Sequence, residues 1–257
     1  MLNYIRAEFY KVLHRKYPYI ALIILLSLEG LLVSGWAFTN SHGNTLDFYT
    51  GFTMIVSLMS VGFAASGLTC DMVLAGHNKH GTLKNEVSFG LSRARIYFGK
   101  LIVQTCMSLL FCVVMIGFYF VLCWFTLYHF DPARDVLALQ ISAWSLVCAL
   151  PVWLGCQALC NACLFLVHAE VAAMILAMFP FFALDSVLDI AGKLFYGTLA
   201  GDIIAKIFNY LPGVILSTSY QVVGVWPFMG QAWIVGAFWM IVPTALGLYF
   251  FRKKEIK

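Results

Sequence analysis

Ionisable side chains are rare in this sequence, so the few that lie inside apolar runs stand out. Glu29 falls near the middle of the first long apolar run. A charged side chain at the centre of a lipid bilayer costs roughly 2.5–3.5 kcal/mol on insertion scales. Glu29 is therefore a lining residue of a transport path, a proton-linked switch, or the partner in an interhelical hydrogen bond that fixes packing.

Two other groups of side chains have the types and spacing of metal ligands. Cys156, Cys160 and Cys163 share one helical face, and thiolates bind soft metals. Cysteine is also a common small packing residue, and no His or carboxylate lies within a turn of the three. His77 and His80 are spaced i, i+3, which suits either a ligand pair or a solvated loop. We expect packing and solvation at these two places, and predict no metal site.

Motifs of the common membrane enzymes and nucleotide-binding proteins are missing from the sequence. It contains no GxxxxGK[ST], no HExxH and no GxSxG. Gly99-Lys100 and Gly192-Lys193 lack both the earlier glycine and the following Ser or Thr of a phosphate-binding loop. We therefore predict no catalytic residue and no cofactor in this chain. If the protein performs energy-driven transport, the energy comes from another chain or from an ion gradient.

The stretch 71–100 is the most informative part of the sequence and carries a net charge of +3. Leu83, Val87 and Leu91 recur at helical spacing, so they form one apolar face. Thr82 can cap the start of this short helix, Gly90 can end it, and Ser92 can cap the next helix. A short helix that is apolar on one face and basic on the other can lie on lipid or dock into a partner.

The composition places the chain in a membrane. Of the 257 residues, 62% are hydrophobic and only 11% are charged, which is too much apolar surface for a soluble domain. The eight cysteines lie in or beside apolar runs, which argues against a disulfide scaffold.

The apolar runs predict an all-α integral membrane protein, with residues 1–257 forming a single transmembrane domain. We expect an interfacial helix over 1–17, because its apolar and basic residues separate onto two faces. Residues 185–228 are too polar for a full span and too apolar for a loop, which predicts partly re-entrant helices. Six transmembrane helices are expected, over about 19–38, 48–69, 101–128, 136–167, 171–184 and 229–251.

The distribution of Lys and Arg predicts the orientation of the spans. Four lie in the N-terminal segment, five in the stretch 71–100 and four at the C-terminus, out of 16 in the chain. Cytoplasmic loops carry such an excess. With six crossings, both termini and the short helix after Gly81 are expected in the cytoplasm.

Glu29 and several large apolar residues of the spans could line a path for a hydrophobic cargo, although packing and lipid contact are the commoner roles for them. The candidates for a translocation path are Glu29, Phe52, Met59, Phe179 and Phe182.

The loop pattern resembles that of a known family. Gly81-Thr82-Leu83-Lys84-Asn85 is followed by Gly90-Leu91-Ser92-Arg93, Ile96-Tyr97 and Gly99-Lys100, and Asn209-Tyr210-Leu211-Pro212 precedes the last span. This order resembles the permease subunit of type-2 ABC transporters. Many relatives carry an acidic residue shortly before the Gly-Thr, where this chain has 77–80 (HNKH).

The resemblance implies two permease chains, identical or sisters, above separate ABC ATPase subunits that bind ATP and Mg²⁺. Each ATPase would grip a cytoplasmic coupling helix, with Leu83, Val87 and Leu91 in its groove and Lys84 or Arg93 at its rim. The coupling residues it implies are Gly81, Thr82, Leu83, Lys84, Val87, Leu91 and Arg93.

The short chain is also similar to bacterial permeases that expel bacteriocins or lantibiotics for immunity, or that export other peptides. This likeness implies a multi-pass protein of the bacterial plasma membrane, in contact with lipid and without a nucleic-acid partner. Two alternatives stay open: a gradient-driven secondary carrier, and a non-transporting membrane scaffold or sensor.

Overall fold

A computed structural model describes residues 1–42, 46–74, 82–167 and 169–254. The described residues are almost entirely helical, and Asp47 and Tyr128 form an isolated β-bridge. The elements are α1 (Leu2–Leu13), α2 (Lys16–Ser41), α3 (Phe48–Ser57), η1 (Leu58–Ser60), α4 (Val61–Leu74), α5 (Thr82–Ser88), α6 (Arg93–Thr126), α7 (Pro132–Leu166), α8 (Glu170–Phe182), α9 (Leu184–Leu194), α10 (Leu199–Phe208), α11 (Pro212–Thr218) and α12 (Trp226–Lys253).

Within the described ranges, five helical segments are long and apolar enough to cross a bilayer. They are α2, α3 to α4, α6, α7 and α12. Two bent pairs, α8 with α9 and α10 with α11, would raise the number to seven if each formed one span. The expectation of an all-α integral membrane protein is confirmed.

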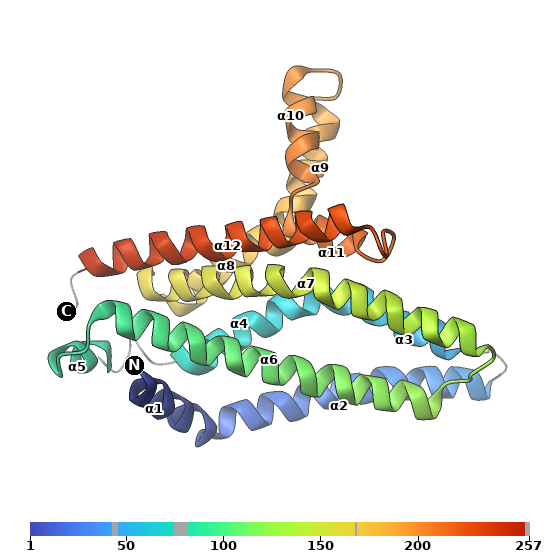
Figure 1. The fold of residues 1–257 in the computed structure, drawn as a ribbon, viewed down its shortest axis with the longest axis horizontal. Coiled ribbons are helices and arrows are strands. Elements are labelled where there is room, and N and C mark those ends of the chain that lie inside the picture. The colour runs from blue at the N-terminus through green and yellow to red at the C-terminus, as the bar shows by residue number, and fades with distance from the viewer. Residues whose placement is uncertain (43–45, 75–81, 168, 255–257) are drawn as a thin grey trace.

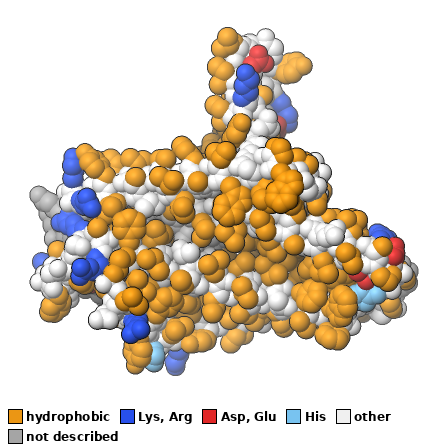
Figure 2. Space-filling model, in the orientation of Figure 1, with side chains coloured by type: hydrophobic (Ala, Val, Ile, Leu, Met, Phe, Trp, Pro, Cys, Tyr) orange, Lys and Arg blue, Asp and Glu red, His pale blue; other side chains and the backbone are white. Residues whose placement is uncertain are grey.

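The long helices lie side by side along the long axis of the molecule (Figure 1). The N-terminus, α5 and the last described residue of the chain lie at the same end of this bundle. We call it the basic end, because Lys and Arg side chains gather on it in Figure 2. At the opposite end, Asp47 pairs with Arg134 at 3.1 Å, and His129 pairs with Asp135 at 2.7 Å.

The contact between α7 and α12 forms the centre of the bundle. A Cβ added to Gly236 of α12 would lie 2.5 Å from the backbone of Pro151, and one added to Gly155 of α7 would lie 2.6 Å from Trp239. Small residues permit this close approach between helices in a membrane. The helix α7 continues through Pro151.

The predicted helix boundaries hold best for the long spans. The helix α6 begins at Arg93, eight residues before the expected start of the third span, so the stretch between spans is shorter than 71–100. The expected fifth span contains only the 13 residues of α8, which ends at Phe182 just after Pro180. At 1.5 Å per residue, α8 alone is too short to cross the hydrocarbon core.

A helical hairpin made of α9 and α10 projects sideways from the bundle (Figure 1). Gly197, with a φ of 79°, lies in the turn between its two helices. The chain bends by 51° where α8 meets α9, and by 64° where α10 meets α11. Short helices were expected over 185–228, and they are present; their re-entrant position in a bilayer stays a prediction.

Candidate functional site

A buried ion-pair cluster joins three helices at the basic end. The Nζ atom of Lys100, in α6, lies 2.9 Å from Glu8 of α1 and 3.3 Å from Glu86 of α5. The Lys100 side chain is 1% exposed and that of Glu8 is 6% exposed. Lys11 approaches Glu8 at 3.5 Å from the outer side. One ammonium group therefore ties the N-terminal helix and the short helix α5 to the start of a long span.

Tyr4 of α1 completes this cluster. Its hydroxyl donates a hydrogen bond of 3.0 Å to Glu86. Its ring lies against Gly99, where an added Cβ would come within 2.5 Å of the ring. Burial, together with the charges of Glu8 and Glu86, raises the pKa of Tyr4 far above its usual value, so the hydroxyl stays a donor. Burial also lowers the pKa of Lys11, and the nearby charge of Lys100 adds to this effect.

Local sequence explains how these side chains reach one another. Glu8 stands three residues after Ile5 and four before Val12, so it lies on the face of α1 that packs inward. Gly90 has a φ of 82° and ends the turn after α5, and the Ser92 hydroxyl then accepts a hydrogen bond from the Arg95 amide. The predicted end at Gly90 and the predicted cap of the next helix at Ser92 are confirmed, whereas the Thr82 side chain, predicted to cap the start, lies outside the described part of the chain.

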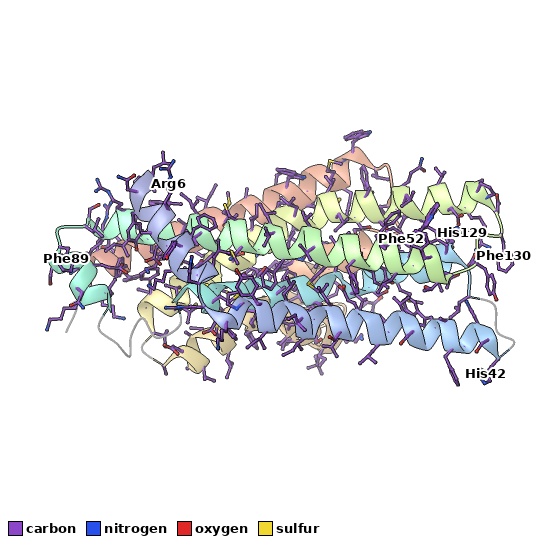
Figure 3. All side chains as sticks on the ribbon, turned by 90° about the horizontal axis from the view of Figure 1, so that it is seen from below. Arg6, His42, Phe52, Phe89, His129 and Phe130 are labelled. Carbon is purple, nitrogen blue, oxygen red and sulfur yellow. The ribbon has the colours of Figure 1, made fainter. Side chains whose placement is uncertain are left out.

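The two faces of α5 have different surroundings. Leu83 is 6% exposed and belongs to the core of this chain, and Val87 and Leu91 pack against the same core. The outer face carries Lys84 and Phe89, and the Phe89 side chain is 87% exposed. In Figure 3, Phe89 points away from the bundle. Leu83 therefore packs inside this chain, and its expected place in a partner groove stays a prediction.

Part of the predicted coupling motif lies outside the described residues. Gly81 falls there, together with His77 and His80, and only the backbone of Thr82 is described. The role of Gly81, Thr82, Lys84, Val87 and Leu91 in coupling to an ATPase stays a prediction.

Arg93, expected at the rim of a partner, is engaged with the C-terminal end of α12. Its Nη1 atom lies 2.6–2.9 Å from the backbone oxygens of Phe251, Arg252 and Lys254. A cation there satisfies carbonyls that have no partner within the helix. Its expected contact at the rim of a partner stays a prediction. Lys254 in turn donates to the carbonyl of Phe165 at the end of α7, at 2.9 Å, and burial lowers the pKa of its ammonium.

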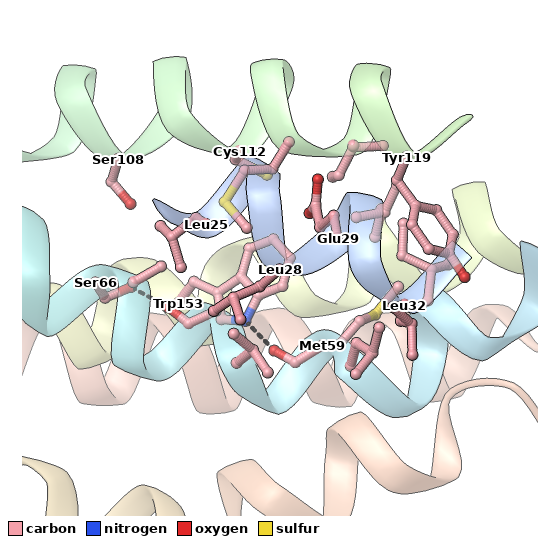
Figure 4. A pocket seen from close by; sticks show the side chains of 18 residues that line it. Leu25, Leu28, Glu29, Leu32, Met59, Ser66, Ser108, Cys112, Tyr119 and Trp153 are labelled. Atoms are coloured by element: carbon pink, nitrogen blue, oxygen red, sulfur yellow. Dashed lines mark hydrogen bonds between the residues drawn. The ribbon is translucent and has the colours of Figure 1, made fainter. Parts of the chain in front are cut away.

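The predicted path residues are only partly brought together. Glu29 and Met59 line the same cavity, which lies among α2, α3, η1, α4, α6 and α7 (Figure 4). Phe52 is buried and stacks on Phe48 at 5.1 Å between ring centroids. Phe182 contacts Phe63, and Phe179 on the same helix is half-exposed. The role of these five residues in a translocation path stays a prediction.

The cysteine face of α7 packs inside the bundle. Cys156, Cys160 and Cys163 are buried, and the Cys156 thiol lies 3.9 Å from the carbonyl oxygen of Phe63. Among the residues that the structure describes, no three His, Cys, Asp or Glu side chains are placed to share a metal ion.

Sequence reasoning missed several polar contacts within the spans. Gln104 of α6 donates to Asn161 of α7 at 3.0 Å, and Gln157 donates to Thr69 of α4 at 3.3 Å. The available signal was the presence of amide side chains within apolar runs, where buried polar groups need partners. Their pairing across helices could not be read from one sequence.

The model of one protein family matches residues 4–184, which is more than two thirds of the chain. It describes the ABC-2 family transporter proteins. The chain belongs to this family. The match includes α1, α5 and the first part of the bundle, and therefore the whole Lys100 cluster. A comparison with curated proteins found no match.

Membership gives the chain its general role. This ABC-2 chain is a multi-pass membrane protein and the permease of an ABC transporter. In the ABC-2 family the permease is generally non-catalytic, and an associated ABC ATPase subunit hydrolyses ATP. The resemblance drawn from the loop 81–100 is confirmed at this level.

Proposed function

We propose that this permease forms the membrane pathway of an exporter in the bacterial plasma membrane, with both termini and α5 in the cytoplasm. Two permease chains, either identical or related, would enclose the pathway. Each would contact a separate ATPase subunit that binds ATP and Mg²⁺. We propose an amphipathic or hydrophobic cargo, of which an antimicrobial peptide is one example.

One observation carries the assignment of α5 as the coupling helix. Its inner face is fixed to α1 and α6 through Glu86 and Lys100, while Phe89 at its end is 87% exposed. A large aromatic side chain exposed beside cations favours a protein partner, because buried aromatic anchors dominate binding energy at interfaces. Force applied to Phe89 would then reach α6 through a rigid joint.

The docking face differs from the one expected from sequence. Leu83, Val87 and Leu91 hold α5 to its own chain, so the partner would contact the outer residues. Lys84, Asn85, Ser88 and Phe89 are exposed and make up this face. We propose that Phe89 fills the ATPase groove and that Lys84 meets acidic groups at its rim.

Co-purification tests this proposal. The permease would be expressed with a tag, together with its ABC ATPase subunit, and the bound ATPase would be quantified. Phe89→Asp should remove the ATPase from the purified complex, because it places a charge at the centre of the interface. Phe130→Asp provides the matched control, because Phe130 is 62% exposed at the opposite end of the bundle.

Both variants should elute as monodisperse protein in detergent, which separates lost binding from lost folding. Undiminished ATPase in the Phe89→Asp preparation would overturn the assignment of this face. Recovery of a non-ATPase partner instead would favour a scaffold.

A further inference from the structure

The cavity that contains Glu29 has the size and shape of a ligand site. Its volume is about 360 Å³, and its lining is mainly apolar. Small-molecule sites occupy roughly 300–1,000 Å³ and combine an apolar lining with a few polar groups. Leu28 and Leu58 line the cavity and are themselves exposed on the outside of the bundle. The cavity is therefore reached from the side that faces lipid.

Glu29 supplies a carboxylate without a counter-ion. Its Oε2 atom is buried and has no hydrogen-bond partner. The described residues that line the cavity include no Lys, Arg or His. A buried carboxylate is costly unless it takes up a proton or pairs with a cation. The described lining of the cavity offers no such cation, so a cation that pairs with Glu29 would come from outside this chain.

Three other polar side chains of the cavity are already bonded to the backbone. The Tyr119 hydroxyl donates to the Gly51 carbonyl at 2.6 Å, and the Trp153 indole donates to that of Met59 at 3.0 Å. The Ser66 hydroxyl donates to the Gly62 carbonyl at 2.8 Å. In the view of Figure 4, the Glu29 carboxylate lies between Cys112 and Tyr119. It is the charged group available to a ligand.

We propose that this cavity binds a single-chain amphiphilic amine, with its ammonium group on the Glu29 carboxylate. The alkyl chain would lie among the apolar side chains and leave toward the lipid between Leu28 and Leu58. This ligand class fits because it brings both the apolar volume and the positive charge that the site lacks. Its role as cargo rests on the proposed function, whereas its binding does not.

Photolabelling tests the proposal with two matched compounds. The complete permease, in lipid nanodiscs and with any ATPase that co-purifies, would be labelled with a diazirine-bearing dodecylamine and with the corresponding dodecanol. We expect saturable labelling of cavity residues by the amine, located by mass spectrometry. Charge-assisted hydrogen bonds contribute enough that Glu29→Gln should weaken amine labelling by about tenfold or more. Labelling by the alcohol should not change.

Two further variants distinguish loss of the site from loss of folding. Ser108→Phe should reduce labelling by both compounds, because Ser108 lines the cavity and a larger side chain there would fill it. Asp202→Asn removes an exposed carboxylate on α10 and should leave both labels unchanged. Equal saturable labelling by amine and alcohol in the unaltered protein would overturn the proposal, because the cavity would then hold only lipid chains. A preference for the amine that persists in Glu29→Gln would also overturn the proposal.

The experiment does not depend on the docking of an ATPase. Loss of the Glu29-dependent preference with intact co-purification would reject the amine site and leave the coupling assignment standing. A Glu29-dependent preference without any ATPase in the complex would retain the binding site and reject its role as a cargo site.

Discussion

Lys100 and Glu8, 92 residues apart in the sequence, form an ion pair of 2.9 Å that is almost completely shielded from solvent. The same ammonium group also holds Glu86 of α5. A buried ion pair need not stabilise a fold more than apolar residues would, but it fixes which groups lie together. Here it joins α1, α5 and the start of α6 into one unit at the basic end of the bundle.

Removing the ammonium group should destabilise this unit strongly. Lys100→Met leaves Glu8 and Glu86 without their shared cation, and breaking a buried pair in this way costs about 3–5 kcal/mol. The melting temperature of the detergent-solubilised protein should fall clearly. Lys84→Met is the matched control, because Lys84 is exposed on α5, and surface changes usually stay within about 0.5 kcal/mol. Equal melting temperatures of the two variants would contradict the role given to Lys100.

Arg93 should hold the last turn of α12. Arg93→Met removes charge-assisted hydrogen bonds worth about 1.5–3 kcal/mol each to carbonyls at the end of that helix. Hydrogen exchange of the amides over 249–254 should therefore become faster. Arg252→Met removes an exposed cation from the same turn and should leave their exchange close to that of the unaltered protein. Unchanged exchange in Arg93→Met would show that other contacts hold this end.

Replacing Gly236 even by alanine, the next larger residue, should lower the stability of the protein. Gly236→Ala places a methyl group against the Pro151 backbone, and overpacking of this kind costs about 1–3 kcal/mol. Gly230→Ala, on the same helix, meets nothing within 4 Å and should leave stability equal or slightly higher. Thermal unfolding of the two variants compares these positions directly. A Gly236→Ala protein as stable as Gly230→Ala would contradict the close packing of α7 and α12.

The opposite end of the bundle should respond to pH through His129. Its two ring nitrogens lie 3.0 Å from the Trp124 carbonyl and 2.7 Å from Asp135, and these contacts raise the pKa of the imidazole. Protonated His129 therefore stabilises the fold fully below its unfolded pKa of about 6.5. This contribution is lost as the pH rises through the raised, folded pKa.

The difference in melting temperature between the unaltered protein and His129→Gln should accordingly shrink with rising pH. His42→Gln serves as the control, because the His42 ring bonds only Ser41 and Phe38 of its own helix end among the described contacts. A difference that stays constant, or that grows, with pH would contradict the proposed charge state of His129.

Much of the fold follows from local patterns, whereas the contacts of the site do not. Gly90 marked the end of α5 and Ser92 the start of α6, because caps and positive φ angles depend on nearby residues. Glu8 interrupts the inward face of α1, and Lys100 is a charge beside an apolar run, yet their pairing requires the tertiary fold. Periodicity likewise gave the apolar face of α5, but not the side on which its partner lies.

Residues 171–224 show a second limit of sequence reasoning. The apolar residues of 171–184 predicted a fifth span ending at Leu184, with shorter and more polar helices after it. The chain instead breaks after Phe182 and turns into the projecting hairpin. Pro180 and the polar residues Asp185 and Asp189 were the local signals for this break.

The accessibility of α5 tests the central claim most directly. Ser88→Cys would be treated with a membrane-impermeant maleimide in inside-out vesicles and in intact cells, with and without the ATPase subunit. Labelling of the native cysteines, measured in the unaltered protein, would be subtracted. The account predicts labelling only from the cytoplasmic side, and protection of this cysteine when the ATPase is bound. Labelling from outside the cell, or unchanged labelling in the presence of bound ATPase, would contradict it.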